Sequence, residues 1–154
     1  MKILMVCLGN ICRSPIAEGI LRHKLQQQNI EGVETDSAGT SSYHIGEAPD
    51  SRMRETAKDN GVNIDDLSAR QFVVEDYDEF DLIYAMDSSN FNNMIALARS
   101  EEDQAKVKLI LNETNPGANN AVPDPYYGGD EGFQHVYDLL DNATNVIIEK
   151  YVKG

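Results

Sequence analysis

Cys7 and Arg13 stand six positions apart near the start of the chain, with Gly9 and Asn10 between them. A cysteine thiolate is a strong nucleophile, and a guanidinium presents a planar fork that matches two oxygens of a phosphoryl group. Gly9 and Asn10 tolerate the positive φ that a tight loop requires. The residue types and their spacing therefore predict a loop that holds an anion with the sulfur of Cys7 beneath it.

The segments on either side of this loop, residues 7–14, support the prediction. An apolar run precedes it, and Ser14 followed by Pro15 is typical of the start of a helix, with Ser14 as the expected cap and Pro15 at the first helical position. In a short loop between a strand and a helix, successive N–H groups point into one concavity, and the helix N-terminus adds partial positive charge. The common nucleotide-binding patterns, Gly-x-x-x-x-Gly-Lys-Ser/Thr and Gly-x-Gly-x-x-Gly, do not follow the first apolar run. We therefore expect a phosphate loop of another kind.

A carboxyl group much later in the chain can complete such a site. Breaking a phosphate ester calls for a proton on the departing oxygen, and an Asp on a loop over the site can supply it. Asp124 lies between Pro123 and Pro125, which stiffen its loop. An Asp-Pro pair alone is more typical of a turn, but beside the loop at Cys7 it favours a general acid.

Tyr126 and Tyr127 follow directly after this segment. Neighbouring aromatic residues usually pack in a core or on a surface. Here they can form the walls of a slot in which a phenyl ring stacks, with Leu8 as its floor. Such a slot would favour phosphotyrosine, whose phosphate sits farther from the backbone than that of phosphoserine.

Apolar runs of strand length alternate with segments of helical periodicity along the chain. Strands at different points of such a chain form a parallel sheet that helices cover on both faces, and sites lie beyond the carboxyl ends of the strands. We therefore predict a three-layer α/β sandwich with a twisted, parallel, four-stranded sheet and the phosphate loop after the first strand. The expected strands are 2–6, 33–37, 81–86 and 107–111, the expected helices are 15–28, 50–60, 88–99 and 133–151, and 112–132 is expected to be a loop.

Length and composition limit the possible functions. The 154 residues suit a single domain over 1–154, and the net charge of -13 argues against binding to nucleic acid or to an anionic membrane surface. Two cysteines make neither a secreted disulfide framework nor a closed zinc site, and the three histidines are scattered. The chain has no apolar run of about 18 residues, and its start is unlike a signal peptide. We expect a cytoplasmic protein.

A resemblance extends over nearly the whole chain. Residues 6–15, Val-Cys-Leu-Gly-Asn-Ile-Cys-Arg-Ser-Pro, with Ala17 and Glu18, resemble the signature of the low-molecular-weight protein-tyrosine phosphatases. Further segments of this family occur in the same order: Asp-Ser-Ala-Gly-Thr at 36–40, Ala-Arg-Gln at 69–71, Ala-Met-Asp at 85–87 and Val-Pro-Asp-Pro-Tyr-Tyr at 122–127. Several motifs in one order are much more specific than the loop alone.

The resemblance implies hydrolysis of phosphotyrosine in proteins through a cysteinyl-phosphate intermediate. It gives Cys7 the role of nucleophile, Arg13 that of phosphate clamp and Asp124 that of general acid and base, with no metal and no cofactor. Phosphotyrosine-containing proteins are the implied partners, and a cognate tyrosine kinase is one candidate among them. The implied substrate-binding residues are Leu8, Gly9, Asn10, Ile11, Cys12, Ser14, Tyr43, Tyr126 and Tyr127.

Within this interpretation, Ser14 is expected to hydrogen-bond the sulfur and Ser37 to brace Asn10. Leu67 stands where some members of the family carry a histidine, so this bracing network is expected to be simpler here. Cys12 is either a small apolar filler or the partner of Cys7 in a reversible disulfide.

Two other functions compete with the phosphatase interpretation. A thiol-dependent arsenate reductase shares this type of loop, but its chemistry needs further cysteines, and none follows Cys12. The second competing function is a non-catalytic phosphate-binding module. The joint presence of Cys7, Arg13 and Asp124 disfavours it.

Overall fold

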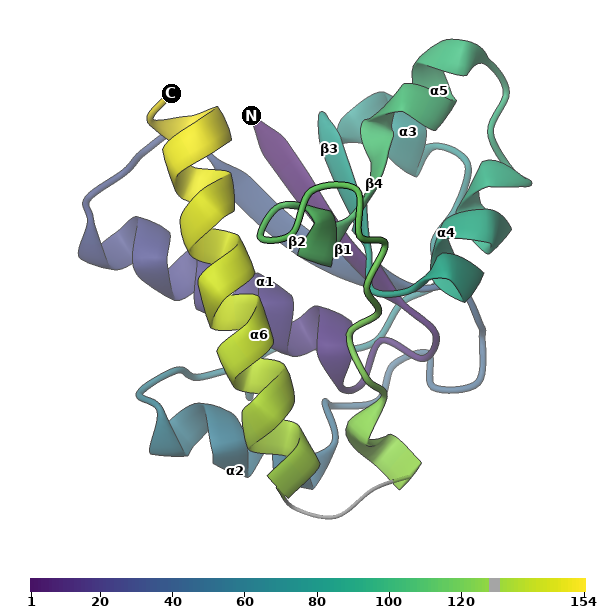
Figure 1. Cartoon of the computed structure of the whole chain (residues 1–154). Helices are drawn as coiled ribbons and strands as arrows, with labels where there is room; N and C mark the ends of the chain where they lie inside the picture. Colours follow the sequence, from purple (N-terminus) through teal and green to yellow (C-terminus); the bar gives the residue numbers. More distant parts are fainter. Residues whose placement is uncertain (128–130) are drawn as a thin grey trace.

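A four-stranded parallel sheet forms the centre of the computed structural model, which describes residues 1–127 and 131–154 (Figure 1). All pairings between neighbouring strands are parallel, and the first strand occupies an inner position. The strands are β1 (Lys2–Cys7), β2 (Glu34–Gly39), β3 (Leu82–Ala85) and β4 (Val107–Leu109), in the order β2-β1-β3-β4.

Helices lie on both faces of this sheet. Figure 1 shows α1 and α6 crossing one face, with α2 beside them, and α3 and α4 on the opposite side. The α-helices are α1 (Arg13–Gln27), α2 (Ser51–Asp59), α3 (Asp76–Glu79), α4 (Ser88–Ile95), α5 (Glu101–Lys106) and α6 (Glu131–Ile147). Short 3₁₀ turns cover Ile110–Asn112 and Pro125–Tyr127, and a π-helical turn, Ile148–Val152, continues α6.

The side chains of β1 alternate between two cores. Ile3 and Met5 belong to the core under α1 and α6, whereas Leu4 and Val6 belong to the core on the other face. All four are fully buried. A strand buried on both faces appears in the sequence as a continuous apolar run, which explains the Lys-Ile-Leu-Met-Val start.

The predicted fold class is confirmed, while several boundaries differ. The strand expected at 33–37 is shifted to Glu34–Gly39, and the helix expected at 88–99 ends at Ile95. Two short helices, α3 and α5, were not expected. They are rich in acidic residues and too short to show an apolar period, so the pattern that reveals longer helices is missing from them.

The start of α1 differs from the expected capped start. The helix begins at Arg13, one residue before Ser14, and within the described residues no side chain caps it. Ser14 is fully buried, and its hydroxyl oxygen lies 3.0 Å from the sulfur of Cys7. The prediction that Ser14 caps the helix is wrong because this hydroxyl contacts groups in the loop instead.

The chain ends and the predicted site lie at opposite ends of the sheet (Figure 1). The amino group of Met1 donates to the carbonyl of Gly32 at 2.9 Å, beside the start of β2, and the C-terminus lies at the same end of the molecule. The loop that follows Cys7 lies beyond the carboxyl ends of the strands, as parallel sheets favour. Among the described helices, none combines the length and the apolar character needed to cross a membrane.

Gly19 provides a test of the packing between α1 and the segment after α2. Glycine inside a helix usually costs about 1 kcal/mol relative to alanine. Here a Cβ at Gly19 would overlap Cγ2 of Ile64 and lie 3.3 Å from Cγ1 of Val62. We expect Gly19→Ala to lower the free energy of unfolding by about 1–3 kcal/mol, measured by urea denaturation.

Gly132→Ala in α6 is the matched control, because among the described residues its Cβ would meet only Pro125, at an ordinary 3.6 Å. It should be neutral or stabilising. Equal stability of the two variants would contradict the close packing of α1 described here.

Candidate active site

Cys7 ends β1 and starts the loop. Its side chain is buried, with 3% of the residue exposed. The N–H of Asn10 donates to its sulfur at 3.3 Å, and the hydroxyl of Ser14 lies 3.0 Å from it. The sulfur therefore accepts one backbone N–H and lies beside a hydroxyl that can donate or accept, a polar environment that differs from that of a thiol packed in an apolar core.

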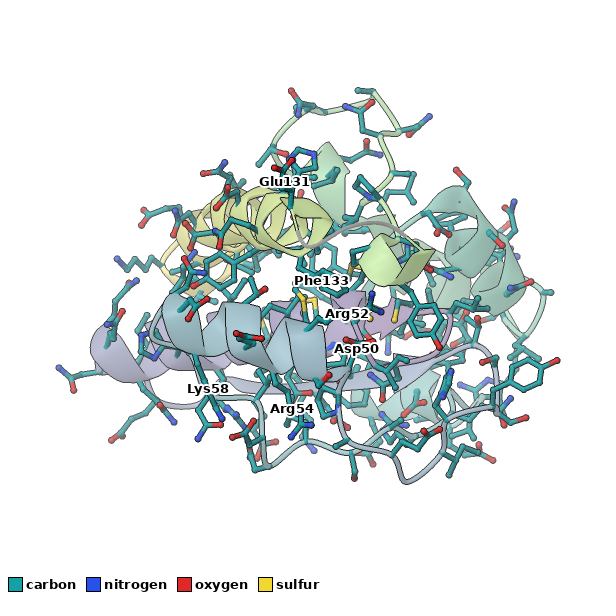
Figure 2. The ribbon with its side chains drawn as sticks, turned by 90° about the horizontal axis from the view of Figure 1, so that it is seen from below. Asp50, Arg52, Arg54, Lys58, Glu131 and Phe133 are labelled. Carbon is teal, nitrogen blue, oxygen red and sulfur yellow. The ribbon has the colours of Figure 1, made fainter. Side chains whose placement is uncertain are left out.

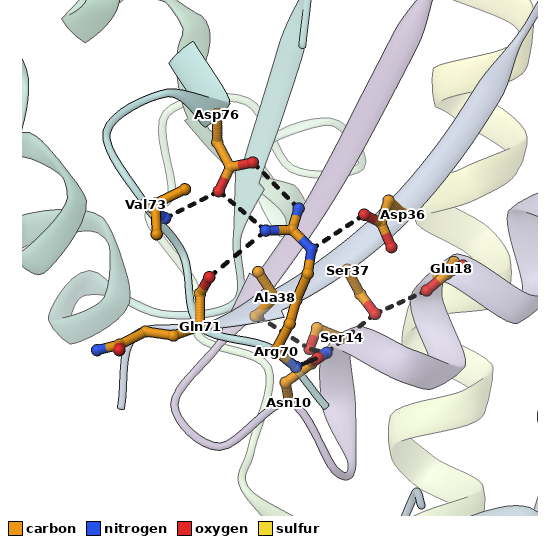
Figure 3. Close-up of polar contacts among 10 residues, drawn as sticks. All are labelled: Asn10, Ser14, Glu18, Asp36, Ser37, Ala38, Arg70, Gln71, Val73 and Asp76. Carbon is orange, nitrogen blue, oxygen red and sulfur yellow. Dashed lines mark hydrogen bonds and ion pairs between the residues drawn. The ribbon is translucent and has the colours of Figure 1, made fainter. Parts of the chain in front are cut away.

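Asn10 determines the shape of the loop. Its φ of 57° lies in the left-handed region, where asparagine is among the few residues that fit. Its side-chain NH₂ donates to Ser14 at 2.8 Å and to Ser37 at 2.9 Å, and its carbonyl oxygen accepts the N–H of Arg70 at 3.0 Å (Figure 3). The bracing of Asn10 by Ser37 follows the expected pattern.

Arg70 fixes this side of the loop through its own ion pairs. Its Nε donates to Asp36 at 3.1 Å, and its terminal nitrogens donate to both carboxylate oxygens of Asp76 at 3.1 Å (Figure 3). Asp76 also accepts the N–H of Val73. The backbone at Arg70 is thereby held where its N–H meets Asn10.

Glu18 ends the network on the α1 side, and no role was predicted for it. The hydroxyl of Ser37 donates to its carboxylate at 2.7 Å. Burial raises the pKa of Glu18 to about 7, although the hydrogen bond from Ser37 acts in the opposite direction. Leu67, the position at which some family members have a histidine, packs against the apolar core instead. The bracing network here therefore ends on a carboxyl group.

The loop backbone presents donors to a cavity at the surface of the protein. In the part of the chain that the structure describes, the N–H groups of residues 8, 9, 11 and 12 donate to no protein acceptor. Such a set of N–H groups at the start of a helix is an anion-binding arrangement. The cavity is lined by Cys7, Leu8, Gly9, Ile11, Cys12, Arg13, His44, Asp124 and Tyr126.

Two glycines permit close packing around the loop. A Cβ at Gly9 would lie 3.0 Å from Cδ2 of His44. A Cβ at Gly39, at the end of β2, would lie 2.8 Å from the carbonyl oxygen of Leu8. Neither residue has a positive φ, so of the two loop residues that tolerate one, Asn10 alone adopts it within residues 7–14.

Arg13 lies almost entirely below the surface, with 4% of its side chain exposed. Its Nη1 donates to Asp87 at 2.8 Å and to the carbonyl of Val122 at 3.0 Å. Asp87 also caps α4 by accepting the N–H of Asn90 at 2.8 Å. The sequence analysis gave Asp87 no role beyond its place in a motif. Its position just beyond the carboxyl end of β3, the end of the sheet where sites lie, could have indicated a contact with Arg13.

Asp124 faces Arg13 across the cavity. One carboxylate oxygen accepts the N–H of Tyr126 at 3.0 Å and so fixes the 3₁₀ turn that follows. The other oxygen lies 3.7 Å from Nη2 of Arg13. Asp124 therefore both forms a turn, as an Asp-Pro pair often does, and lies beside the anion site.

The predicted aromatic slot is formed only in part. Tyr126 lines the cavity, and the ring of His44 lies 6.5 Å from its ring between centroids. Tyr43 is 88% exposed and does not line the cavity, so its assignment to the slot stays a prediction. The side chain of Tyr127 lies outside the described residues. No role at the site was predicted for His44, and its place after Tyr43 gave no clear signal.

The second cysteine of the loop lies in a different environment from the first. Cys12 is free and buried, as is Cys7. Burial raises the pKa of the Cys12 thiol, and the negative charge of Asp50 raises it further. Cys12 is therefore protonated at neutral pH and fits the role of apolar filler, while the disulfide with Cys7 stays a hypothesis.

Comparison with known proteins gives the family of the chain. The family model described as low molecular weight phosphotyrosine protein phosphatase matches residues 2–153. The chain therefore belongs to the low molecular weight phosphotyrosine protein phosphatases, which are hydrolases.

Individual relatives match over almost the full length. A protein of Synechocystis sp., provisionally named as a low molecular weight protein-tyrosine-phosphatase, is 50% identical over 149 residues, which cover 96% of this chain and 94% of the relative. The structure of a protein tyrosine phosphatase from Entamoeba histolytica has a TM-score of 0.93 and 41% identity, and the match covers 100% and 98% of the two chains. The structure of a Drosophila arginine phosphatase has a TM-score of 0.91 and 30% identity and covers 98% of each chain.

Replacing Glu18 by glutamine tests the buried end of the network. A carboxyl group whose pKa is raised from 4.5 to about 7 by folding stabilises the protein below pH 4.5, and that contribution is lost as pH rises through 7. The loss amounts to about 3 kcal/mol at most. We expect the free energy of unfolding of Glu18→Gln to fall less than that of the parent between pH 5 and 8, measured by urea denaturation.

Glu55→Gln, on the exposed side of α2, serves as the control for a general change in charge. A Glu18→Gln variant with the same pH dependence as Glu55→Gln would contradict the raised pKa.

Proposed function

We propose that the chain hydrolyses phosphotyrosine in proteins through a phosphorylated cysteine. The observation that carries the proposal is that Cys7, the loop residues with unpaired N–H groups, Arg13 and Asp124 line one cavity, with Asp124 3.7 Å from the Arg13 guanidinium. These groups are a nucleophile, an anion clamp and a proton donor gathered at one cavity.

In the first step, the Cys7 thiolate attacks phosphorus in line with the departing oxygen. A bond forms between sulfur and phosphorus, and the bond between phosphorus and the tyrosyl oxygen breaks. Asp124 gives its proton to that oxygen, so tyrosine leaves as a neutral phenol. Arg13 and the loop N–H groups bind the other three oxygens while charge is redistributed over them.

In the second step, Asp124 is a carboxylate and removes a proton from water. The water oxygen bonds to phosphorus, the phosphorus–sulfur bond breaks, and inorganic phosphate and the thiolate are released. The hydroxyl of Ser14, 3.0 Å from the sulfur, stabilises Cys7 as it leaves. Arg13 and the backbone dipoles supply the positive field at the phosphate.

The walls of the cavity favour an aromatic phosphate ester. Tyr126 is 40% exposed and Leu8 43% exposed, so both present apolar surface at the cavity. A phenyl ring can stack there, while a shorter phosphoserine would not bring its phosphate to the loop.

Phosphotyrosine-containing proteins, with a cognate tyrosine kinase as one candidate, are the proposed partners. The reduced active-site thiol suits the cytoplasm.

Removal of the nucleophile gives the most direct test. We expect Cys7→Ser to lower kcat for para-nitrophenyl phosphate by more than about 10⁴-fold, because the covalent route is lost. Activity of the parent in added chelator should be unchanged. Substantial activity of Cys7→Ser, or loss of parent activity with chelator, would exclude the proposed mechanism.

The acid is tested by the dependence on the leaving group. Asp124→Asn keeps an oxygen for the N–H of Tyr126 but has no proton to give. We expect kcat/KM for a phosphotyrosine peptide to fall about 10²- to 10⁴-fold. For 2,4-dinitrophenyl phosphate, whose leaving group is stable as an anion, the loss should be small. Equal losses for the two substrates would remove the acid role.

Three assays separate the competing functions. Turnover of arsenate with thioredoxin would favour the arsenate reductase, and binding of phosphopeptide without turnover would favour the binding module. Since one structurally similar protein is an arginine phosphatase, phosphoarginine is the third substrate to compare. A higher kcat/KM for phosphoarginine than for phosphotyrosine would overturn the proposed substrate class while leaving the cysteine mechanism intact.

A further inference from the structure

Arg52, in the first turn of α2, lies between the two loops that form the site (Figure 2). Its guanidinium makes a two-point contact with Asp50, Nε donating to Oδ1 at 3.1 Å and Nη2 donating to Oδ2 at 3.0 Å. The side chain of Asp50 is 11% exposed and that of Arg52 is 39% exposed. A planar, two-point pair of this kind fixes the orientation of the guanidinium.

Asp50 is itself attached to the phosphate loop. Its backbone N–H donates to the carbonyl of Ile11 at 2.7 Å, and its carboxylate caps α2 by accepting the N–H of Arg52 at 2.9 Å. The start of α2 is therefore joined to the loop that holds Cys7. Arg52 extends from this fixed base.

The other side of Arg52 contacts the loop that carries the acid. Its Nη2 donates to the carbonyl of Tyr126 at 3.2 Å, and its guanidinium carbon lies 5.6 Å from the centre of the Tyr126 ring. The same carbon lies 4.7 Å from the centre of the Phe133 ring in α6. These distances are within the range of attraction between a cation and an aromatic face.

Tyr126 connects Arg52 to the acid. The N–H of Tyr126 donates to Oδ1 of Asp124 at 3.0 Å, while its carbonyl and ring contact Arg52. The side chain of Asp124 is 32% exposed, and among residues 1–127 and 131–154 its other polar contact is the 3.7 Å approach to Arg13. Asp124 thus owes much of its orientation to the backbone of Tyr126.

We propose that Arg52 is a positioning residue for the general acid: it ties the Tyr126 backbone to Asp50 and the phosphate loop, and so sets where Asp124 presents its proton. This inference rests on the function proposed above. It concerns proton delivery to the leaving group, not binding of the phosphate.

A purely structural role for Arg52 predicts a different result. If the residue only stabilised the start of α2 and packed on Phe133, its loss would lower stability, or would lower kcat/KM for all phosphate esters alike. A role in placing the acid requires a loss that grows as the leaving group becomes poorer, because only poor leaving groups need the proton.

Arg52→Met tests this difference, because methionine keeps an apolar stem against Phe133 but has no N–H donors. We expect kcat/KM for a phosphotyrosine peptide to fall about 10- to 100-fold, the size expected of a misplaced catalytic group. The loss for 2,4-dinitrophenyl phosphate should be less than about threefold, since that leaving group needs no proton. Arg52→Lys, which keeps the cation beside the Tyr126 ring, should lose less than Arg52→Met.

Arg54→Met is the matched control on the same helix. Arg54 projects to the other side of α2, where it lies 4.0 Å from Asp65 (Figure 2). It should change neither substrate's kcat/KM, and thermal unfolding of each variant verifies that it is folded. If Arg52→Met does not fold, the same comparison is made with Arg52→Lys and Arg52→Gln.

A double variant makes the test decisive. In an Asp124→Asn background, where no proton is delivered, Arg52→Met should reduce kcat/KM for phosphotyrosine by less than about twofold. An undiminished effect in that background, or equal losses for both leaving groups, would overturn the inference. If Asp124→Asn loses more activity toward phosphotyrosine than toward 2,4-dinitrophenyl phosphate and Arg52→Met does not, the inference about Arg52 is wrong and the proposed acid is retained. If Asp124→Asn loses the same activity toward both substrates, the acid role in the proposed function is wrong, and the inference about Arg52 is wrong with it.

Discussion

The rest of the site depends on the hydrogen bonds made by the side-chain amide of Asn10. A left-handed backbone at a residue other than glycine costs about 1–3 kcal/mol, and it persists only where neighbours hold it. Here one amide group meets Ser14, Ser37 and the backbone of Arg70, which belong to three different parts of the chain. The phosphate loop is therefore shaped by the packed fold around it more than by its own sequence.

The site consists of two halves that come from distant parts of the chain. Cys7, the proposed nucleophile, and the loop N–H groups lie at the end of β1 and directly after it, whereas Asp124 belongs to the segment before α6. Arg13 joins the two halves: it belongs to the segment after β1, and it contacts the carbonyl of Val122 and lies near Asp124 in the other half. Asp87, held by its capping role in α4, fixes this guanidinium from a third direction. Proton transfer depends on small distances, so the relative position of the halves matters as much as their chemistry.

The sequence predicted the architecture and the central loop because both leave local patterns. Alternating apolar runs indicate the layers, and the residues from Cys7 to Arg13 indicate an anion site. Glu18 and Asp87 were missed because a single carboxylate has no pattern until the fold brings its partner near. Ser14 was expected both to cap the first helix and to hydrogen-bond the sulfur of Cys7; the contact with the sulfur is present, but the cap is not, because the local preference for a helix cap is overridden.

The arrangement of the chain ends has a practical consequence for the surface that a substrate meets. Both termini lie at the end of the sheet where the strands begin, and the cavity lies at the other end (Figure 1). A substrate protein can therefore approach the cavity without passing either terminus. Attachment of this chain by one end to a support, a scaffold or a fused protein would leave the cavity facing away from the point of attachment.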